Sequence, residues 1–392
     1  MEAANRPCAV IASGALILAC VLAAVRPIQT SSSAPAPLPL PPTAAPVVFG
    51  AVAAEEPPRE LFVLGDSLSD VGNAAAFADY LLGESFYPEH TVGLCNPADV
   101  YVYGRGCADL FYRQSRVSDG PLAVEHQAAH LGLPLDASFH TVPKRPGNGT
   151  DYAVASAKAA GAGPEDLTHQ VDRMLVDHGP LLPSPALFVV MIGGNDGIDA
   201  LQAATEAVSS EAASGSSNAI ITAAVDAMGE NLERLIIFGA RRIIVANVPD
   251  LAVLPAVRAG AASIGVSSLE ASAVIVQTFN ERLEARFAAL AATYPDATIV
   301  RFDLYSAVHQ AAAASVSGRN GTDACFDSLA YRAKWTAERT FHAGCAPPPE
   351  GGAPRFDRFF FWDGIHPTGA AHEAIGRALI GTYVASAAFI QR

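Results

Sequence analysis

Near the C-terminus, an aspartate and a histidine stand at a spacing suited to acid–base chemistry. Asp363 and His366 lie three residues apart in FFFWDGIHPTG, within a stretch otherwise rich in apolar residues. One turn of chain can bring the Asp363 carboxylate back onto Nδ1 of His366. Nε2 of the imidazole then faces outward, where it can take a proton from a hydroxyl group.

Two other roles fit the same residues. Asp363 and His366 could bind a metal ion together with His372, but no further ligand stands at metal-binding spacing. Asp363 could instead cap the last helix, but Pro367 and Thr368 are better placed for the helix start. We therefore interpret the pair as a general base and the carboxylate that orients it.

A serine far upstream is the candidate nucleophile. Ser67 ends the run RELFVLGDS, and a serine two positions later excludes the G-x-S-x-G elbow of ordinary α/β-hydrolases. A nucleophilic serine also needs hydrogen-bond donors for the oxyanion that its attack creates. The side-chain amide of Asn195 and the backbone N–H of Ser67 are candidate donors.

The elements that would position these residues form an alternating pattern. Four β-branched, non-alternating runs are typical of central strands in a parallel sheet covered on both faces. Apolar residues at helical spacing lie between them, and a final helix is expected to start after Thr368 and to run through Ala371 to about Ala387. This alternation predicts an α/β fold, and we find no internal repeat. The predicted strands are residues 59–67, 186–196, 241–250 and 297–303, and the other two predicted helices are 217–238 and 275–290.

Short polar residues follow several of these strands. Ligands of such sheets bind beyond the carboxyl ends of the strands, so Ser67 and Asn195 are expected at the binding edge. Asp, Asn and Gly are also good turn and N-cap residues, and that explanation suffices for any one of them alone. Their joint placement is what favours a site. Asp66 and Asp70 are expected to hold the loop around Ser67.

Composition and the N-terminal segment bear on class and location. The chain has 392 residues, 51% of them hydrophobic, and a formal net charge of −14, which argues against nucleic-acid binding.

Residues 1–26 resemble a signal peptide or an N-terminal anchor, because Arg6 precedes an apolar run. ILAC within this run loosely resembles a bacterial lipobox, in which Cys20 would be lipidated. Residues 27–58, rich in Pro, Ala and Ser, predict a linker, and residues 59–392 the folded domain.

Four cysteines remain after the leader, an even number that indicates disulfides in an exported protein. Because short loops close most easily, we expect Cys95 to pair with Cys107 and Cys325 with Cys345. A structural zinc site is the alternative, but the spacings fit it badly.

The chain resembles the GDSL esterases and lipases, also called SGNH hydrolases, over roughly residues 60–388. Four of its segments match that family's blocks in the family's order. The matching segments are LFVLGDSLSDVGN (61–73), DYAVASAKAAG (151–161), GGND (193–196) and WDGIHPTGAAH (362–372).

The resemblance implies a fold, an activity and a set of residue roles. The fold would be a three-layer α/β/α sandwich with a mostly parallel, flavodoxin-like central sheet. The implied activity is that of a secreted serine esterase or lipase that needs no cofactor or metal. Its substrate would be a lipid or short-chain ester, and the protein could contact a lipid interface. Ser67 would attack the ester carbonyl, with His366 as base and Asp363 as its orienter. Asn195 and the backbone N–H of Ser67 would hold the oxyanion.

The second block departs from the family pattern. The family usually has a glycine here, whose backbone N–H binds the oxyanion, but this chain has Ala155-Ser156-Ala157 in that place. The block also usually begins with Asn, where this chain has Asp151. We take Ser156 as the donor, with Ala155 as the next choice, although residues with a Cβ avoid positive φ.

Three functions stay open at this stage: an ester hydrolase, an acyltransferase of the same family, and a catalytically silent binding module. The triad residues favour an enzyme over the silent module, but they do not separate hydrolysis from acyl transfer. Trp362 and the phenylalanines before it fit core packing better than an acyl pocket.

Overall fold

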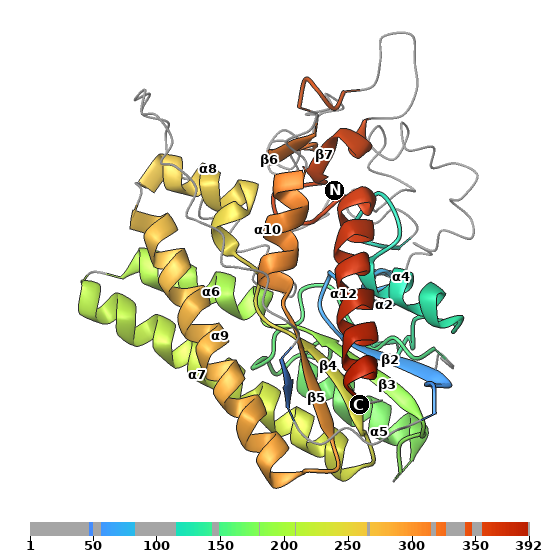
Figure 1. Ribbon diagram of the computed structural model, residues 1–392. Helices are drawn as coiled ribbons and strands as arrows, with labels where there is room; N and C mark the ends of the chain where they lie inside the picture. The colour runs from blue at the N-terminus through green and yellow to red at the C-terminus, as the bar shows by residue number, and fades with distance from the viewer. Residues whose placement is uncertain are drawn as a thin grey trace, which may run out of the picture.

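A five-stranded sheet lies at the centre of the computed structural model, with strand order β1-β5-β4-β3-β2 (Figure 1). Strands β2 to β5 are parallel, and β1 runs antiparallel to β5 at one edge. The four predicted strands are thereby confirmed, as is the mostly parallel sheet. The strands are β1 (Val48–Phe49), β2 (Glu60–Gly65), β3 (Ala186–Met191), β4 (Arg242–Ala246) and β5 (Thr298–Phe302).

The structure describes ten stretches of the chain. The predicted leader with Cys20, and the predicted pair Cys95 and Cys107, lie outside them. The described residues are 47–49, 56–82, 115–142, 149–179, 181–207, 209–264, 267–314, 319–326, 342–346 and 355–390.

Helices cover the sheet on both faces, giving the three-layer α/β/α arrangement (Figure 1). One group is α5 (Leu167–His178), α6 (Gly194–Glu206), α7 (Ser210–Ile237) and α9 (Ser267–Thr293). The other is α4 (Ala123–Leu131), α10 (Leu304–Ala314) and α12 (Gly369–Ile390). The shorter elements are α2 (Asn73–Leu82), α8 (Pro255–Ile264) and two 3₁₀ turns, Leu251–Val253 and Phe356–Arg358.

This double coverage explains why the strands have no alternating pattern. Every residue of β3 is buried, and so are the last five residues of β2. A strand buried on both faces gains from apolar side chains at every position, because each one is removed from water. The three helices that the sequence predicts are confirmed as α7, α9 and α12.

Two features lie outside the predicted pattern. Strand β1 comes from the stretch predicted as linker, and Val48 pairs with Val300 of β5. At the other edge of the sheet, Thr150 and Tyr152 bond to Val63 of β2, so this segment lies against the sheet without forming a named strand. The sheet therefore carries irregular additions on both edges, too short to leave a periodic signal in the sequence.

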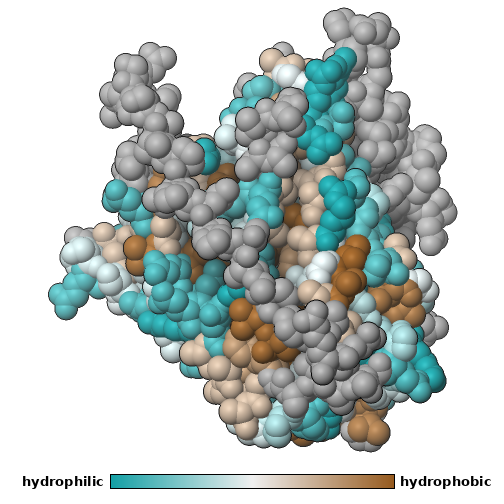
Figure 2. Space-filling view, in the orientation of Figure 1, coloured by the Kyte–Doolittle hydropathy of each residue, from teal (hydrophilic) through white to brown (hydrophobic). Residues whose placement is uncertain are grey.

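A second, smaller sheet leads into the residues of interest. Strand β6 (Asn320–Ala324) pairs in parallel with β7 (Phe359–Phe361). A disulfide joins Cys325 to Cys345 beside it, which confirms the local pairing expected for these two cysteines. Within the described residues, no helix has the length and apolar character needed to cross a bilayer. On the face shown in Figure 2, apolar residues form separate small patches among hydrophilic ones.

Candidate active site

Ser67 lies at the carboxyl end of β2, two residues beyond the last residue of the strand. Strand β2 pairs with β3 in register up to Gly65 and Met191, and the N–H of Asp66 still donates to the Met191 carbonyl at 3.2 Å. A Cβ on Gly65 would lie 2.3 Å from that same carbonyl oxygen. Only glycine fits so close an approach, and it lets the chain turn sharply and expose Ser67 at the sheet edge.

Asp363 and His366 lie in a turn that directly follows β7. Oδ1 of Asp363 accepts the backbone N–H groups of Ile365 at 2.9 Å and His366 at 2.7 Å. These two bonds are the local side-chain-to-backbone pattern that short polar residues favour in turns. The same carboxylate contacts Nδ1 of His366 at 2.9 and 3.0 Å. The three-residue spacing thus brings the carboxylate back onto the ring, as the sequence predicts.

A continuous chain of hydrogen bonds joins the three residues. Nε2 of His366 lies 2.9 Å from Oγ of Ser67, across 299 positions of sequence. With Nδ1–H donating to Asp363, Nε2 is the acceptor for the Ser67 hydroxyl proton. Asp363 and His366 are both buried, and Ser67 is half-buried. This arrangement can generate a serine alkoxide during attack and store its proton on the imidazole.

The Asp363 carboxyl is kept ionised. Burial by itself would raise its pKa, but the charge and hydrogen bond of His366 and the two backbone N–H groups act more strongly. The pKa of Asp363 is therefore below its ordinary value of 3.8. An ionised Asp363 stabilises the imidazolium that forms when His366 accepts a proton.

Asn195 lies at the start of α6, just after the carboxyl end of β3. Gly193 precedes the helix with φ +108°, a conformation that favours glycine. The amide Nδ2 of Asn195 donates to the Ala157 carbonyl at 2.9 Å. One amide hydrogen is used by this bond, which fixes the side chain beside the 155–157 segment. The second hydrogen is available to a ligand.

Ser156 has the backbone conformation that glycine would adopt most easily. Its φ is +74°, one of three positive values at non-glycine positions among the described residues. The N–H groups of Ser156 and Ser67 do not donate to any other described residue. Where the chain departs from the family pattern, a serine with its Cβ thus takes a positive φ. Both N–H groups stay available for an oxyanion.

Replacing Ser156 with glycine is expected to preserve activity. Left-handed backbone costs an L-residue roughly 1–2 kcal/mol, whereas glycine loses only roughly 0.5–1 kcal/mol more chain entropy on folding. Ser156→Gly should therefore keep turnover within about threefold and raise the unfolding free energy by up to about 1 kcal/mol. Ser156→Val is the contrasting variant, because a β-branched residue fits positive φ worst. Equal turnover and equal urea midpoints for Gly and Val would contradict this account.

Buried carboxylates hold the loop after Ser67. The four N–H groups that donate to Asp70, at 2.6 to 3.0 Å, are those of Gly72, Asn73, Ala74 and Ala155. Asp151 accepts from Val71 and Ala153, at 2.8 and 2.9 Å. Burial raises the pKa of both carboxyls, and the charge of Asp70 raises that of Asp151 further. The sequence predicts a structural role for Asp70 but not the bond to Ala155, which ties the nucleophile loop to the segment containing Ser156.

A second set of polar contacts ties that segment to α6. Oδ2 of Asp196 accepts the Ala159 N–H at 2.8 Å, and Lys158 forms an ion pair with Asp199 one turn further along the helix. In the sequence, Asp196 stands out because it follows Asn195 at a helix start, where the helix dipole stabilises a negative charge. Lys158 had no such signal, because its partner is distant in sequence.

Asp66 is a titratable neighbour of the nucleophile. Burial raises its pKa to about 7, with a further upward push from Asp196, while the Leu68 N–H and the charge of His366 act against this. Oδ1 of Asp66 accepts that Leu68 N–H at 3.1 Å. The carboxyl therefore changes its charge near neutral pH, directly beside Ser67.

His372 lies on the first turn of α12 and is buried. Its Nδ1 accepts the Ala123 N–H at 3.3 Å, and its Nε2 has no hydrogen-bond partner among the described residues. Burial, followed by the charges of His366 and His126, lowers its pKa from 6.5 to about 3. With this pKa, His372 is neutral near pH 7 in the folded protein.

His372 should make the fold sensitive to acid. The unfolded chain binds a proton near pH 6.5 but the folded one only near pH 3, so stability falls as pH drops through this window. His372→Asn keeps an acceptor for Ala123 and removes the titration. Between pH 7 and 5, wild type should lose about 2 kcal/mol of unfolding free energy relative to this variant. Urea unfolding at both pH values measures the difference, and parallel pH dependences would contradict the prediction.

No group of three or more His, Cys, Asp or Glu side chains within the described residues could hold a metal ion.

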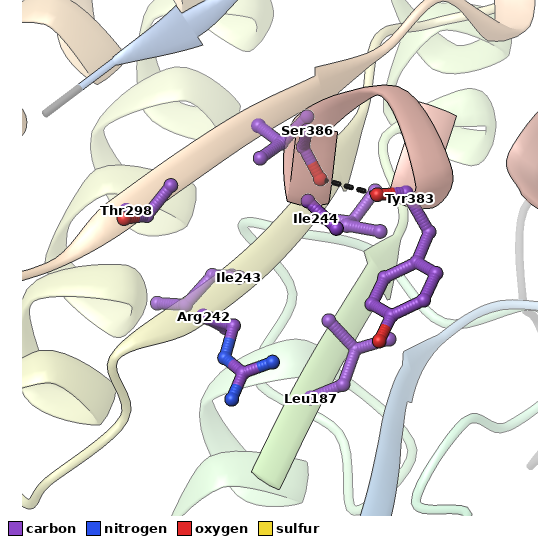
Figure 3. Close-up of a pocket in the computed structure, with 9 residues that line it drawn as sticks. Leu187, Arg242, Ile243, Ile244, Thr298, Tyr383 and Ser386 are labelled. Atoms are coloured by element: carbon purple, nitrogen blue, oxygen red, sulfur yellow. Dashed lines mark hydrogen bonds between the residues drawn. The ribbon is translucent and has the colours of Figure 1, made fainter. Parts of the chain in front are cut away.

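A pocket lies far from Ser67, between α12 and the amino-terminal ends of β3, β4 and β5 (Figure 3). Leu187, Ile243 and Ile244 line it, with Arg242 and Tyr383 at its side. It is at the opposite end of the strands from the candidate active site and holds none of its residues.

Trp362 is buried in a small apolar cluster separate from the main core. Its indole packs near Phe326, with ring centroids 6.3 Å apart. Phe360 and Phe361 belong to the main core. These aromatic side chains are therefore buried in apolar clusters of the described residues, as core packing predicts.

Comparisons with known proteins agree with this geometry. A family model described as GDSL-like Lipase/Acylhydrolase matches residues 61–379. In Arabidopsis thaliana, the protein named GDSL esterase/lipase APG is 33% identical over 162 residues, which cover 40% of this chain and 43% of that protein. Anther-specific proline-rich protein APG, from the same plant, is 28% identical over 149 residues, or 38% of this chain and 26% of that protein. The chain thus spans less than half the length of these two relatives.

A third match covers more of both chains. The Arabidopsis protein named inactive GDSL esterase/lipase-like protein 23 is 24% identical over 331 residues, or 82% of this chain and 79% of that protein. Overall similarity therefore includes a protein named as inactive, and activity has to be argued from the site residues themselves.

Proposed function

Because the chain belongs to the GDSL-like lipase and acylhydrolase family, we propose that it hydrolyses carboxylic esters, with Ser67 as the nucleophile. The observation that carries the proposal is the hydrogen-bond chain from Ser67 through His366 to Asp363. A packing role would not require a serine hydroxyl, an imidazole and a buried carboxylate to be aligned in this way. Such an alignment is what a nucleophilic serine needs for activation.

In the acylation step, Oγ of Ser67 attacks the ester carbonyl while Nε2 of His366 takes the hydroxyl proton. Asp363 holds the ring and stabilises its positive charge. The tetrahedral oxyanion accepts hydrogen bonds from the Asn195 amide and from the backbone N–H groups of Ser67 and Ser156. The C–O bond to the alcohol then breaks, and His366 returns its proton to the leaving alkoxide. The products are a free alcohol and an acyl ester on Ser67.

Deacylation repeats the chemistry with water. His366 takes a proton from a water molecule, the resulting hydroxide attacks the acyl carbonyl, and the proton returns to Oγ of Ser67 as the carboxylic acid leaves. An alcohol that competes with water at this step would turn the same site into an acyltransferase. The substrate class we propose is a lipid or short-chain ester, for an exported protein.

The test is covalent labelling combined with an ester panel. A fluorophosphonate probe should label Ser67, and p-nitrophenyl esters from acetate to palmitate, with a phospholipid, should define the acyl preference. A catalytically silent module is the second candidate, favoured by the similarity to a relative named inactive. That module would give neither labelling of Ser67 nor ester cleavage. Such a result would overturn the proposed function.

A further inference from the structure

We propose that the Cys325–Cys345 disulfide and Phe326 are positioning elements for His366, acting through Trp362. This inference deepens the proposed function and rests on it. It assigns a role in the reaction to residues outside the triad and the proposed oxyanion donors.

The backbone supplies the first argument. The N–H of Cys325 donates to the Phe361 carbonyl at 3.0 Å, and the N–H of Phe326 donates to the Trp362 carbonyl at 2.9 Å. The N–H of Trp362 in turn donates to the His366 carbonyl at 2.8 Å. Both backbone groups of Trp362 are thus engaged, one with the disulfide-linked strand and one with the turn that holds the imidazole.

The side chains of this region also pack against one another. Trp362, Phe326 and both half-cystines are buried together in the small cluster, which lies apart from the main core. Ala155, next to Ser156, belongs to the same cluster. The described residues of this cluster are few, and a covalent cross-link adds to the stabilisation that their burial gives.

The disulfide is itself fixed at both ends. The carbonyl of Cys325 accepts the His342 N–H, and the carbonyl of Cys345 accepts the Arg355 N–H, each at 2.9 Å. Cys325 and Cys345 are 20 positions apart, and the cross-link adds a covalent bond to the backbone contact between Cys325 and His342. Opening the disulfide would leave Phe326 held beside Trp362 by hydrogen bonds and packing alone, which permit larger displacements.

The expected consequence is a loss of alignment between His366 and Ser67. Those two side chains meet at 2.9 Å, and a displacement of about 1 Å in a reacting group can cost about 10²-fold in rate. The double variant Cys325→Ala/Cys345→Ala should lower kcat by about 10- to 100-fold, with KM within about threefold. Fluorophosphonate labelling of Ser67 should slow by a similar factor.

The experiment uses the full chain in four forms. They are wild type, the double cysteine variant, Phe326→Ala with the disulfide intact, and Thr322→Ala. Thr322 is exposed on β6, and its hydrogen bonds within the described residues go to Asn320, so its variant should match wild type. All assays run well below each variant's melting temperature. If the double variant fails to fold, Phe326→Ala tests the same contact with the cross-link in place.

A spectroscopic signal separates positioning from general instability. The His366 Nδ1–H held by Asp363 should give a downfield proton resonance, which both positioning variants should broaden or lose while their circular dichroism stays native. A folded variant that keeps this resonance, the wild-type kcat and the wild-type labelling rate would overturn the inference. If wild type itself shows neither labelling nor turnover, the proposed function fails, and the resonance still decides whether the disulfide positions His366.

Discussion

Replacing Ser67 with alanine should abolish ester hydrolysis and leave the fold intact. The hydroxyl oxygen is the atom that attacks, and no other hydroxyl in the described structure contacts Nε2 of His366. Removing one member of such a triad typically removes the contribution of the whole unit, so kcat should fall by about 10⁴-fold or more. Steady-state hydrolysis of a p-nitrophenyl ester measures this loss.

Two controls make this result specific. Ser216→Ala makes the same change at an exposed serine of α7 and should retain full activity. Melting curves of Ser67→Ala should match wild type, because Ser67 is only half-buried and its side-chain hydrogen bond within the described part of the chain is to His366. Turnover of Ser67→Ala at even a tenth of the wild-type rate would show that another group attacks the ester, and the proposed mechanism would be wrong.

The sequence was sufficient to predict the sheet and the residues that gather at its edge. Strands buried on both faces are continuous apolar runs, and the polar residues that stop them stand out. Asp363 and His366 were predictable as a pair because their contact is local, within a single turn. The family resemblance is confirmed by the match over residues 61–379.

What the sequence could not supply were contacts between distant segments. Asp70 accepts the Ala155 N–H across 85 positions, and no local pattern marks that bond. The left-handed backbone at Ser156 was also hidden, because serine seldom adopts it. Strand β1 is two residues long and lies in a Pro-rich stretch, so its pairing with β5 depends on the finished sheet.

Asp363→Asn should be nearly as damaging as loss of the nucleophile. An asparagine side chain has almost the same size, and its oxygen can still accept the N–H groups of Ile365 and His366, so the turn should persist. The amide nitrogen would replace Oδ2, the carboxylate oxygen 2.9 Å from Nδ1, and would present a donor to that ring nitrogen. The imidazole would then carry its proton on Nε2, where it can no longer accept the Ser67 hydroxyl proton. The expected loss is about 10⁴-fold in kcat, with little change in KM.

A matched substitution separates this tautomer effect from a loss of negative charge in the region. Asp357→Asn makes the same change at an exposed carboxylate in the 3₁₀ turn just before β7, and it should retain wild-type turnover. The His366 Nδ1–H resonance should vanish in Asp363→Asn and persist in Asp357→Asn. If Asp363→Asn kept more than about a tenth of the wild-type kcat, the carboxylate would be holding the turn without setting the protonation of His366. The role of Asp363 would then be structural, and the base would have to work without an orienting charge.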